Sequence, residues 1–119
     1  MALILVIDDA STVRDLVCRM LADAQHSVIE ANDGETGLAL FQERHPALVI
    51  TDLIMPKMEG IETIQRLRQA KPDAKIIAMS AKGRLYLGAA QKLGADAALS
   101  KPFQPAELLA VVDRLLASA

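Results

Sequence analysis

Short apolar runs alternate with amphipathic stretches from one end of the chain to the other. The runs are four or five residues long and mostly aliphatic, several with β-branched side chains, which is typical of strands buried on both faces of a sheet. The run at 27–31 is more polar, which suits a strand nearer the edge of the sheet. The pattern predicts strands over residues 3–7, 27–31, 48–51, 76–79 and 97–100.

Each amphipathic stretch has apolar residues three or four positions apart, which indicates a helix with one apolar face. In the first, at 11–23, the apolar positions are Val13, Leu16, Val17, Met20 and Leu21. Asp33 stands where a helix N-cap is expected, and Pro105 stands at a first helical position. The pattern predicts helices over 11–23, from Asp33 to the stop at His45-Pro46, over 60–71, over 84–93, and from Pro105 onward.

Five strand–helix units in a chain of 119 residues indicate one α/β domain. Parallel strands joined by helices form an open sheet with helices on both faces. We therefore expect a doubly wound, five-stranded parallel sheet in one domain over residues 1–119.

The composition of the chain excludes several classes of function. The formal net charge is -2, so no basic field attracts the chain to nucleic acid or to an anionic membrane. The single cysteine excludes an internal disulfide and a cysteine-based zinc site. The N-terminal apolar run is too short for a signal peptide or a membrane span. We expect a cytoplasmic protein that binds neither nucleic acid nor membrane.

Polar side chains follow four of the five predicted strands. Asp8 and Asp9 follow the first, Asp52 the third, Ser80 the fourth and Lys101 the fifth. Ligands of open parallel sheets bind beyond the carboxyl ends of the strands. If these four strands are neighbours, their polar side chains converge on one small site.

Such a site suits a divalent cation and phosphoryl chemistry. Three close carboxylates repel one another, and a cation removes that penalty. Ligands that are all oxygen favour Mg²⁺ over zinc. An aspartate can also act as a nucleophile and form an aspartyl-phosphate, while Lys101 neutralises the phosphoryl oxygens and Ser80 offers a hydroxyl to one of them.

This arrangement resembles the receiver domain of two-component response regulators, in particular those similar to the chemotaxis regulator. The matching motifs occur along the whole chain in the same order as in that family. The resemblance implies a flavodoxin-like strand order 2-1-3-4-5, which makes the four polar strand ends neighbours. It also implies a cis peptide bond before Pro102. The matching residues are Asp8-Asp9, Asp52, Met55-Pro56, Gly60, Ser80 and Lys101-Pro102-Phe103.

The resemblance implies a role for each acidic residue. Asp52 is the expected phosphoacceptor. Asp9 and Asp52 are expected to bind Mg²⁺, or Mn²⁺ in its place, together with the backbone carbonyl of Ile54. Asp8 is expected to hold a metal-bound water.

The same resemblance makes Lys101 the contact of the phosphoryl group and Ser80 the switch hydroxyl. Two features depart from the family pattern. Ala98 stands where receivers usually have an aromatic residue that reports switching, which puts the coupling to output in doubt. Ile54 and Lys82 flank the expected path of the hydrolytic water, and an isoleucine cannot steer that water.

The implied function is a phosphoacceptor switch. A sensor histidine kinase or a histidine phosphotransfer protein donates the phosphoryl group, and the domain changes its protein-interaction surface. It is not an enzyme with a separate product, beyond its own phosphorylation and dephosphorylation. Its target is a separate protein or, in a longer chain, an output domain. Because the sequence stops after the last predicted helix, we expect either a free-standing receiver or one excised from a longer regulator.

Two other functions are compatible with a sheet of this kind. An aspartyl-phosphate phosphatase on a similar fold needs a second acid two residues after its nucleophile, where this chain has Ile54. A flavodoxin-like cofactor binder needs a Gly- or Thr-rich phosphate loop after the first strand, where this chain has Asp8-Asp9-Ala10. The plainest reading makes the Asp8-Asp9 pair a cap for the first helix. Cys18 is expected to be a small buried hydrophobic residue.

Overall fold

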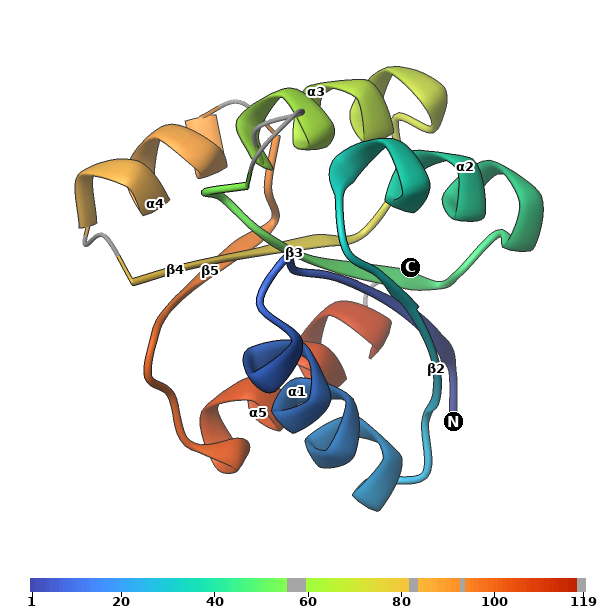
Figure 1. The fold of residues 1–119 in the computed structure, drawn as a ribbon, viewed down its shortest axis with the longest axis vertical. Coiled ribbons are helices and arrows are strands. Elements are labelled where there is room, and N and C mark those ends of the chain that lie inside the picture. Colours follow the sequence, from blue (N-terminus) through green and yellow to red (C-terminus); the bar gives the residue numbers. More distant parts are fainter. Residues whose placement is uncertain (56–59, 82–83, 93, 118–119) are drawn as a thin grey trace.

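The computed structural model describes residues 1–55, 60–81, 84–92 and 94–117, with the side chains of 84–87 excepted. The predictions that concern Pro56 and Lys82 fall outside these residues. Within them, strands and helices alternate as predicted (Figure 1). The elements are β1 (Leu3–Ile7), α1 (Ser11–Asp23), β2 (Ser27–Ala31), α2 (Gly34–Arg44), β3 (Leu48–Asp52), α3 (Gly60–Ala70), β4 (Ile76–Ser80), α4 (Arg84–Lys92), β5 (Ala97–Ser100) and α5 (Pro105–Ala117).

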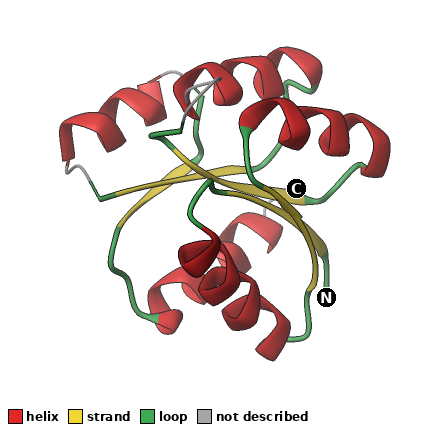
Figure 2. Ribbon diagram, in the orientation of Figure 1, coloured by secondary structure: helices red, strands yellow, loops and turns green. Residues whose placement is uncertain are grey.

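All the strands pair in parallel, in the order β2-β1-β3-β4-β5. The predicted order and the edge position of β2 are therefore confirmed. Helices α1 and α5 cover one face of the sheet, and α2, α3 and α4 cover the other (Figures 1 and 2). No helix in the described part of the chain is long and apolar enough to cross a membrane.

The sheet separates two apolar cores because neighbouring residues of a strand point to opposite faces. In β1, Leu5 and Ile7 belong to the core under α2 and α3, whereas Ile4 and Val6 belong to the core under α1 and α5. All four side chains are fully buried. This burial on both faces explains why the central strands are continuous apolar runs rather than alternating ones.

The predicted element ends agree with the structure to within one residue. The Asp33 carboxylate accepts a hydrogen bond from the Thr36 N–H at 2.8 Å, as an N-cap does. His45 ends α2 with φ of 51°, in the left-handed region. β3 and β4 each run one residue further than predicted, so Asp52 and Ser80 close their strands instead of following them.

Two predictions for α1 need correction. Val17 and Leu21 are buried as expected, but Leu16 is 54% exposed although it belongs to the same apolar pattern. The apolar face of α1 is therefore wider than the strip that the sheet and α5 cover. Cys18 is only partly buried, at the margin of the core.

Candidate functional site

The carboxyl ends of the strands place the predicted polar residues side by side. Ile7 in β1 is paired with Thr51 in β3, so Asp8 and Asp52 come next on neighbouring strands. Asp52 is paired in turn with Met79 in β4. Ser80 therefore lies one residue beyond the level of Asp52, on the adjacent strand.

Asp8, Asp9 and Asp52 form an acidic cluster in which one carboxylate oxygen of each residue lies within 4.8 Å of the others. Asp8 is fully buried, Asp52 is 6% exposed and Asp9 is exposed. The donors are all carboxylate oxygens, the set that Mg²⁺ prefers, with neither imidazole nor thiolate among them. The chemistry of this donor set therefore fits Mg²⁺.

Lys101 connects the two buried carboxylates. Its Nζ lies 2.9 Å from Asp8 Oδ2 and 3.1 Å from Asp52 Oδ1. Its backbone N–H donates to the carbonyl of Ser80 at 2.9 Å, and the Lys101–Pro102 peptide is cis, as predicted. The lysine thus reaches the ends of β1 and β3 from the far side of β4.

Burial and these contacts shift the pKa values of Asp52 and Lys101. Burial raises the pKa of the Asp52 carboxyl; Lys101 opposes this shift, while Asp8 and Asp9 add to it. Burial alone lowers the pKa of Lys101, but its contacts with Asp8 and Asp52 outweigh burial and raise that pKa. Lys101 is therefore firmly protonated at neutral pH. The pKa of Asp52 stays raised even beside this ammonium, so a second cation at the cluster would favour the charged carboxylate.

Asp8 is held on several sides. Its backbone N–H donates to the Ala31 carbonyl at 3.1 Å, and its Oδ1 accepts from the Ala10 N–H at 2.9 Å. Ala10 is the N-cap of α1 and makes no side-chain capping bond. The interpretation of the Asp8-Asp9 pair as a helix cap is therefore wrong, because Asp8 binds the N–H of the cap residue and not one inside the helix.

Arg14 was not predicted as part of the site. Its Nη1 donates to the backbone carbonyl of Asp8 at 2.8 Å, and its Nε donates to Glu30 Oε1 in β2 at 3.0 Å. One feature of the sequence could have pointed to Arg14. It is a positive charge at the end of the first turn of a helix, where the helix dipole disfavours a cation.

The remaining predicted residues surround this core. Ser80 is fully buried. The side chain of Ile54, two residues past Asp52, is 41% exposed. The backbone N–H of Gly60 donates to the Leu53 carbonyl at 2.9 Å, and a methyl group at Gly60 would overlap the Asp52 carbonyl oxygen. The chain thus returns against the end of β3, and glycine is required there.

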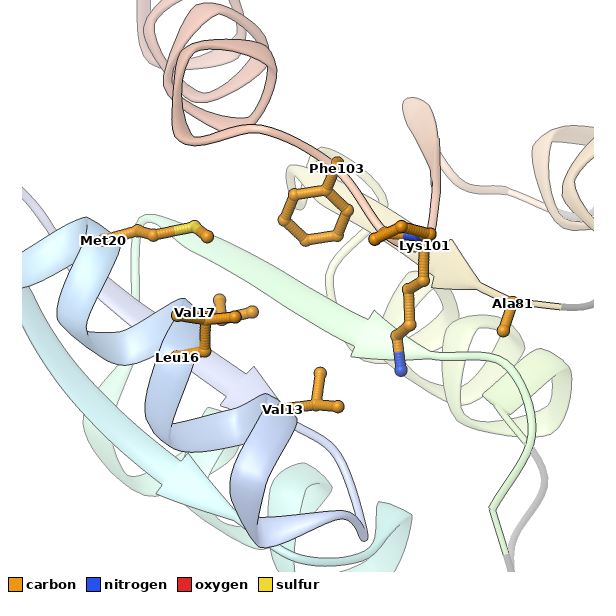
Figure 3. A pocket seen from close by; sticks show the side chains of 8 residues that line it. Val13, Leu16, Val17, Met20, Ala81, Lys101 and Phe103 are labelled. Carbon is orange, nitrogen blue, oxygen red and sulfur yellow. The ribbon is translucent and has the colours of Figure 1, made fainter.

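An apolar groove of about 320 Å³ opens beside the acidic cluster, between α1 and the segment after β5. Lys101 borders this groove, and its ammonium is directed toward the end of β3 (Figure 3). Leu16, the exposed side chain of α1, is part of its wall. The other lining residues are Val13, Val17, Met20, Ala81, Pro102 and Phe103.

Comparison with known proteins agrees with this geometry. The family described as response regulator receiver domain matches residues 4–113. The chain is 39% identical over 115 residues to the probable transcriptional regulator ycf27 of Porphyridium aerugineum, covering 95% of this chain and 47% of that protein. It is 37% identical over 116 residues to the alkaline phosphatase synthesis transcriptional regulatory protein PhoP of Bacillus subtilis, covering 95% of this chain and 48% of that protein.

The chain therefore spans about half the length of these curated relatives. Among solved structures, a putative response regulator from Chloroflexus aurantiacus J-10-fl superposes with a TM-score of 0.94 at 30% identity, over 98% of each chain.

Proposed function

The chain belongs to the response regulator receiver domain family, and we propose that it is a phosphoacceptor switch of a two-component or phosphorelay system, with the receiver domain spanning residues 1–119. One observation carries this proposal: Asp52 closes a central strand within reach of both a lysine ammonium and two further carboxylates. A nucleophile, a cationic contact and an oxygen-donor metal site are thus combined in one place.

In the proposed reaction, a carboxylate oxygen of Asp52 attacks the phosphorus of a phosphohistidine on a sensor kinase or phosphotransfer protein. A P–O bond forms as the P–N bond breaks, and the imidazole nitrogen keeps the electron pair of the broken bond. Mg²⁺ or Mn²⁺, held by Asp9, Asp52 and the Ile54 carbonyl, with Asp8 acting through a water, would neutralise the carboxylates and the phosphoryl oxygens. The ammonium of Lys101, which lies 3.1 Å from Asp52 Oδ1, would contact the same oxygens.

Phosphorylation also supplies the switch. The phosphoryl group carries about one and a half to two negative charges. Because the Asp52 carboxylate gives up its own charge when the acyl phosphate forms, the net gain at the end of β3 is about one half to one negative charge. We expect Lys101 to exchange its contact with Asp52 for one with the phosphoryl group, and the Ser80 hydroxyl to move toward that group. The surface built by the surrounding loops then changes for a target protein or an output domain. We place this activity in the cytoplasm, without direct contact with nucleic acid or membrane and without a released small-molecule product other than phosphate.

The apolar groove supports a protein as the phosphodonor. It is continuous with Lys101, and an exposed leucine, Leu16, stands at its wall. A donor that brings phosphohistidine to Asp52 can bury an apolar side chain in this groove, whereas a small donor such as acetyl phosphate cannot. We therefore propose that the phosphohistidine-bearing protein docks against α1.

The test is labelling with acetyl phosphate in Mg²⁺. The wild type should gain about one acid-labile phosphate per chain, Asp52→Asn should gain none, and excess chelator should prevent labelling. Asp73→Asn, which alters an exposed aspartate before β4, is the matched control and should label normally. Stoichiometric labelling of Asp52→Asn would overturn the proposal. Steady turnover of small phosphate esters would instead indicate the aspartyl-phosphate phosphatase, which Ile54 at the position of the second acid argues against.

A further inference from the structure

We infer that Arg14 is a positioning residue that holds the Asp8–Asp9 peptide in the orientation needed for cation binding; this inference rests on the proposed Mg²⁺ site. Arg14 joins three segments through one guanidinium group. It extends from α1, donates to the backbone carbonyl of Asp8 at 2.8 Å, and pairs with Glu30 of β2 at 3.0 Å. Its side chain is 18% exposed, so these contacts are largely shielded from water.

The location of Arg14 argues against a role in helix stability. It is the fourth residue of α1, near the positive end of the helix dipole, where a cation is unfavourable. The first turn of α1 contains no acidic residue that would offset this charge. The Glu30 carboxylate is 46% exposed, and such partly solvated pairs contribute little to stability. The contact with Asp8 is therefore the distinctive feature of this arginine.

The carbonyl that Arg14 binds belongs to the peptide unit between Asp8 and Asp9. The Asp8 carboxylate is already held by hydrogen bonds from the Ala10 N–H and the Lys101 ammonium. Asp9 is exposed, so the direction of its side chain depends more than that of Asp8 on the orientation of the peptide unit between them. By fixing the carbonyl oxygen, Arg14 keeps the peptide from rotating and the Asp9 carboxylate close to Asp52.

A positioning role of Arg14 and a purely electrostatic role predict opposite effects of its removal on Mg²⁺ affinity. If Arg14 acted only through its charge, its removal would relieve repulsion with a bound cation and strengthen Mg²⁺ binding. If it positions Asp9, its removal weakens Mg²⁺ binding despite the more favourable electrostatics. Loss of partners that orient metal ligands typically lowers metal affinity 10–100-fold.

The experiment is calorimetric titration of Mg²⁺ into the phosphate-free chain. Arg14→Gln should raise the Kd for Mg²⁺ about tenfold, and Arg14→Lys should fall in between, because an ammonium cannot serve both acceptors with the fixed fork of a guanidinium. Arg19→Gln removes an exposed arginine from the same helix and should leave the Kd unchanged. Thermal unfolding in chelator shows that each variant is folded at the titration temperature.

A double-mutant cycle identifies the residue through which Arg14 acts. If that residue is Asp9, Arg14→Gln should add no further loss of affinity in an Asp9→Asn background. Equal or tighter binding by both Arg14 variants, or a full additional loss in the Asp9→Asn background, would overturn the inference. A wild type that binds Mg²⁺ no better than Asp9→Asn would refute the metal site itself, and the inference with it.

Discussion

Replacing Lys101 with methionine removes one positive charge and keeps most of the side-chain length. The lysine side chain is 16% exposed, and it contacts Asp8, which is fully buried, and Asp52, whose side chain is 9% exposed. Each charge pair at about 3 Å has a gross attraction of about 5 kcal/mol at an effective dielectric constant of about 20. The cost of burying the ammonium offsets much of this attraction.

Removing one member of a buried ion pair typically destabilises a protein by about 3–5 kcal/mol. We expect the lower end of that range for Lys101→Met, because the Asp52 carboxyl, whose pKa burial already raises, can take up a proton once the lysine is gone. For a domain of this size, a loss of about 3 kcal/mol lowers Tm by about 10–15 °C.

Mg²⁺ should reverse part of this loss, because it replaces the missing charge. With Lys101 present, three carboxylates face one ammonium; without it, they face none. At a Mg²⁺ concentration of about ten times the Kd, the wild type gains about 1.4 kcal/mol, and the variant gains more because its affinity is higher.

Urea and thermal unfolding in chelator and in Mg²⁺ measure both effects. Lys71→Met, which changes an exposed lysine after α3, is the matched control and should behave like the wild type. A loss below about 1 kcal/mol for Lys101→Met in chelator, or a smaller Mg²⁺ stabilisation than in the wild type, would refute the assignment of Lys101 as the counter-charge of the cluster.

Three further substitutions test the surroundings of the site, and a fourth, in α4, serves as a comparison. Leu16→Asp should slow phosphotransfer from a phosphohistidine protein at least tenfold, about 1.4 kcal/mol in the barrier, and leave labelling by acetyl phosphate unchanged; equal slowing of both would exclude docking at the groove. Ile54→Asn should shorten the phosphoryl lifetime about tenfold, because asparagine can hydrogen-bond a water aligned with the Asp52–phosphoryl bond; unchanged decay after donor removal would count against this. Gly60→Ala should destabilise by about 1–3 kcal/mol, since the methyl group meets the backbone of β3. Gly88→Ala, which meets open space within α4, should instead stabilise by up to ~1 kcal/mol, and comparing urea midpoints tests both.

Periodicity predicted the elements well because each has a buried face that the sequence must supply. β3 shows the limit of this signal. Its apolar run ends at Thr51, but the parallel ladder continues through Asp52, which pairs with Met79. Backbone hydrogen bonding does not depend on side-chain polarity, so an aspartate can extend a strand that hydropathy ends one residue earlier.

Arg14 and the apolar groove could not be predicted in the same way, because both depend on distances between elements. Helical spacing places Leu16 on the same face as Val17, but only the packing of α1 against the sheet and α5 decides which of them is covered. Arg14 reaches Glu30 because α1 lies across β2, a crossing that depends on the strand order.

In the proposed function, the contacts of Lys101 link the stability of the fold to phosphorylation. The same ammonium that holds Asp8 and Asp52 together in the resting state is the group we expect to contact the phosphoryl group. The proposed phosphorylation would therefore loosen an ion pair that stabilises the fold, and a bound cation would offset the charge that is left behind. A substitution that strengthened the Lys101–Asp52 pair would raise stability and slow phosphorylation together. The exposed acidic residue, Asp9, stands outside that pair, which leaves it available to a cation while the lysine still occupies the buried carboxylates.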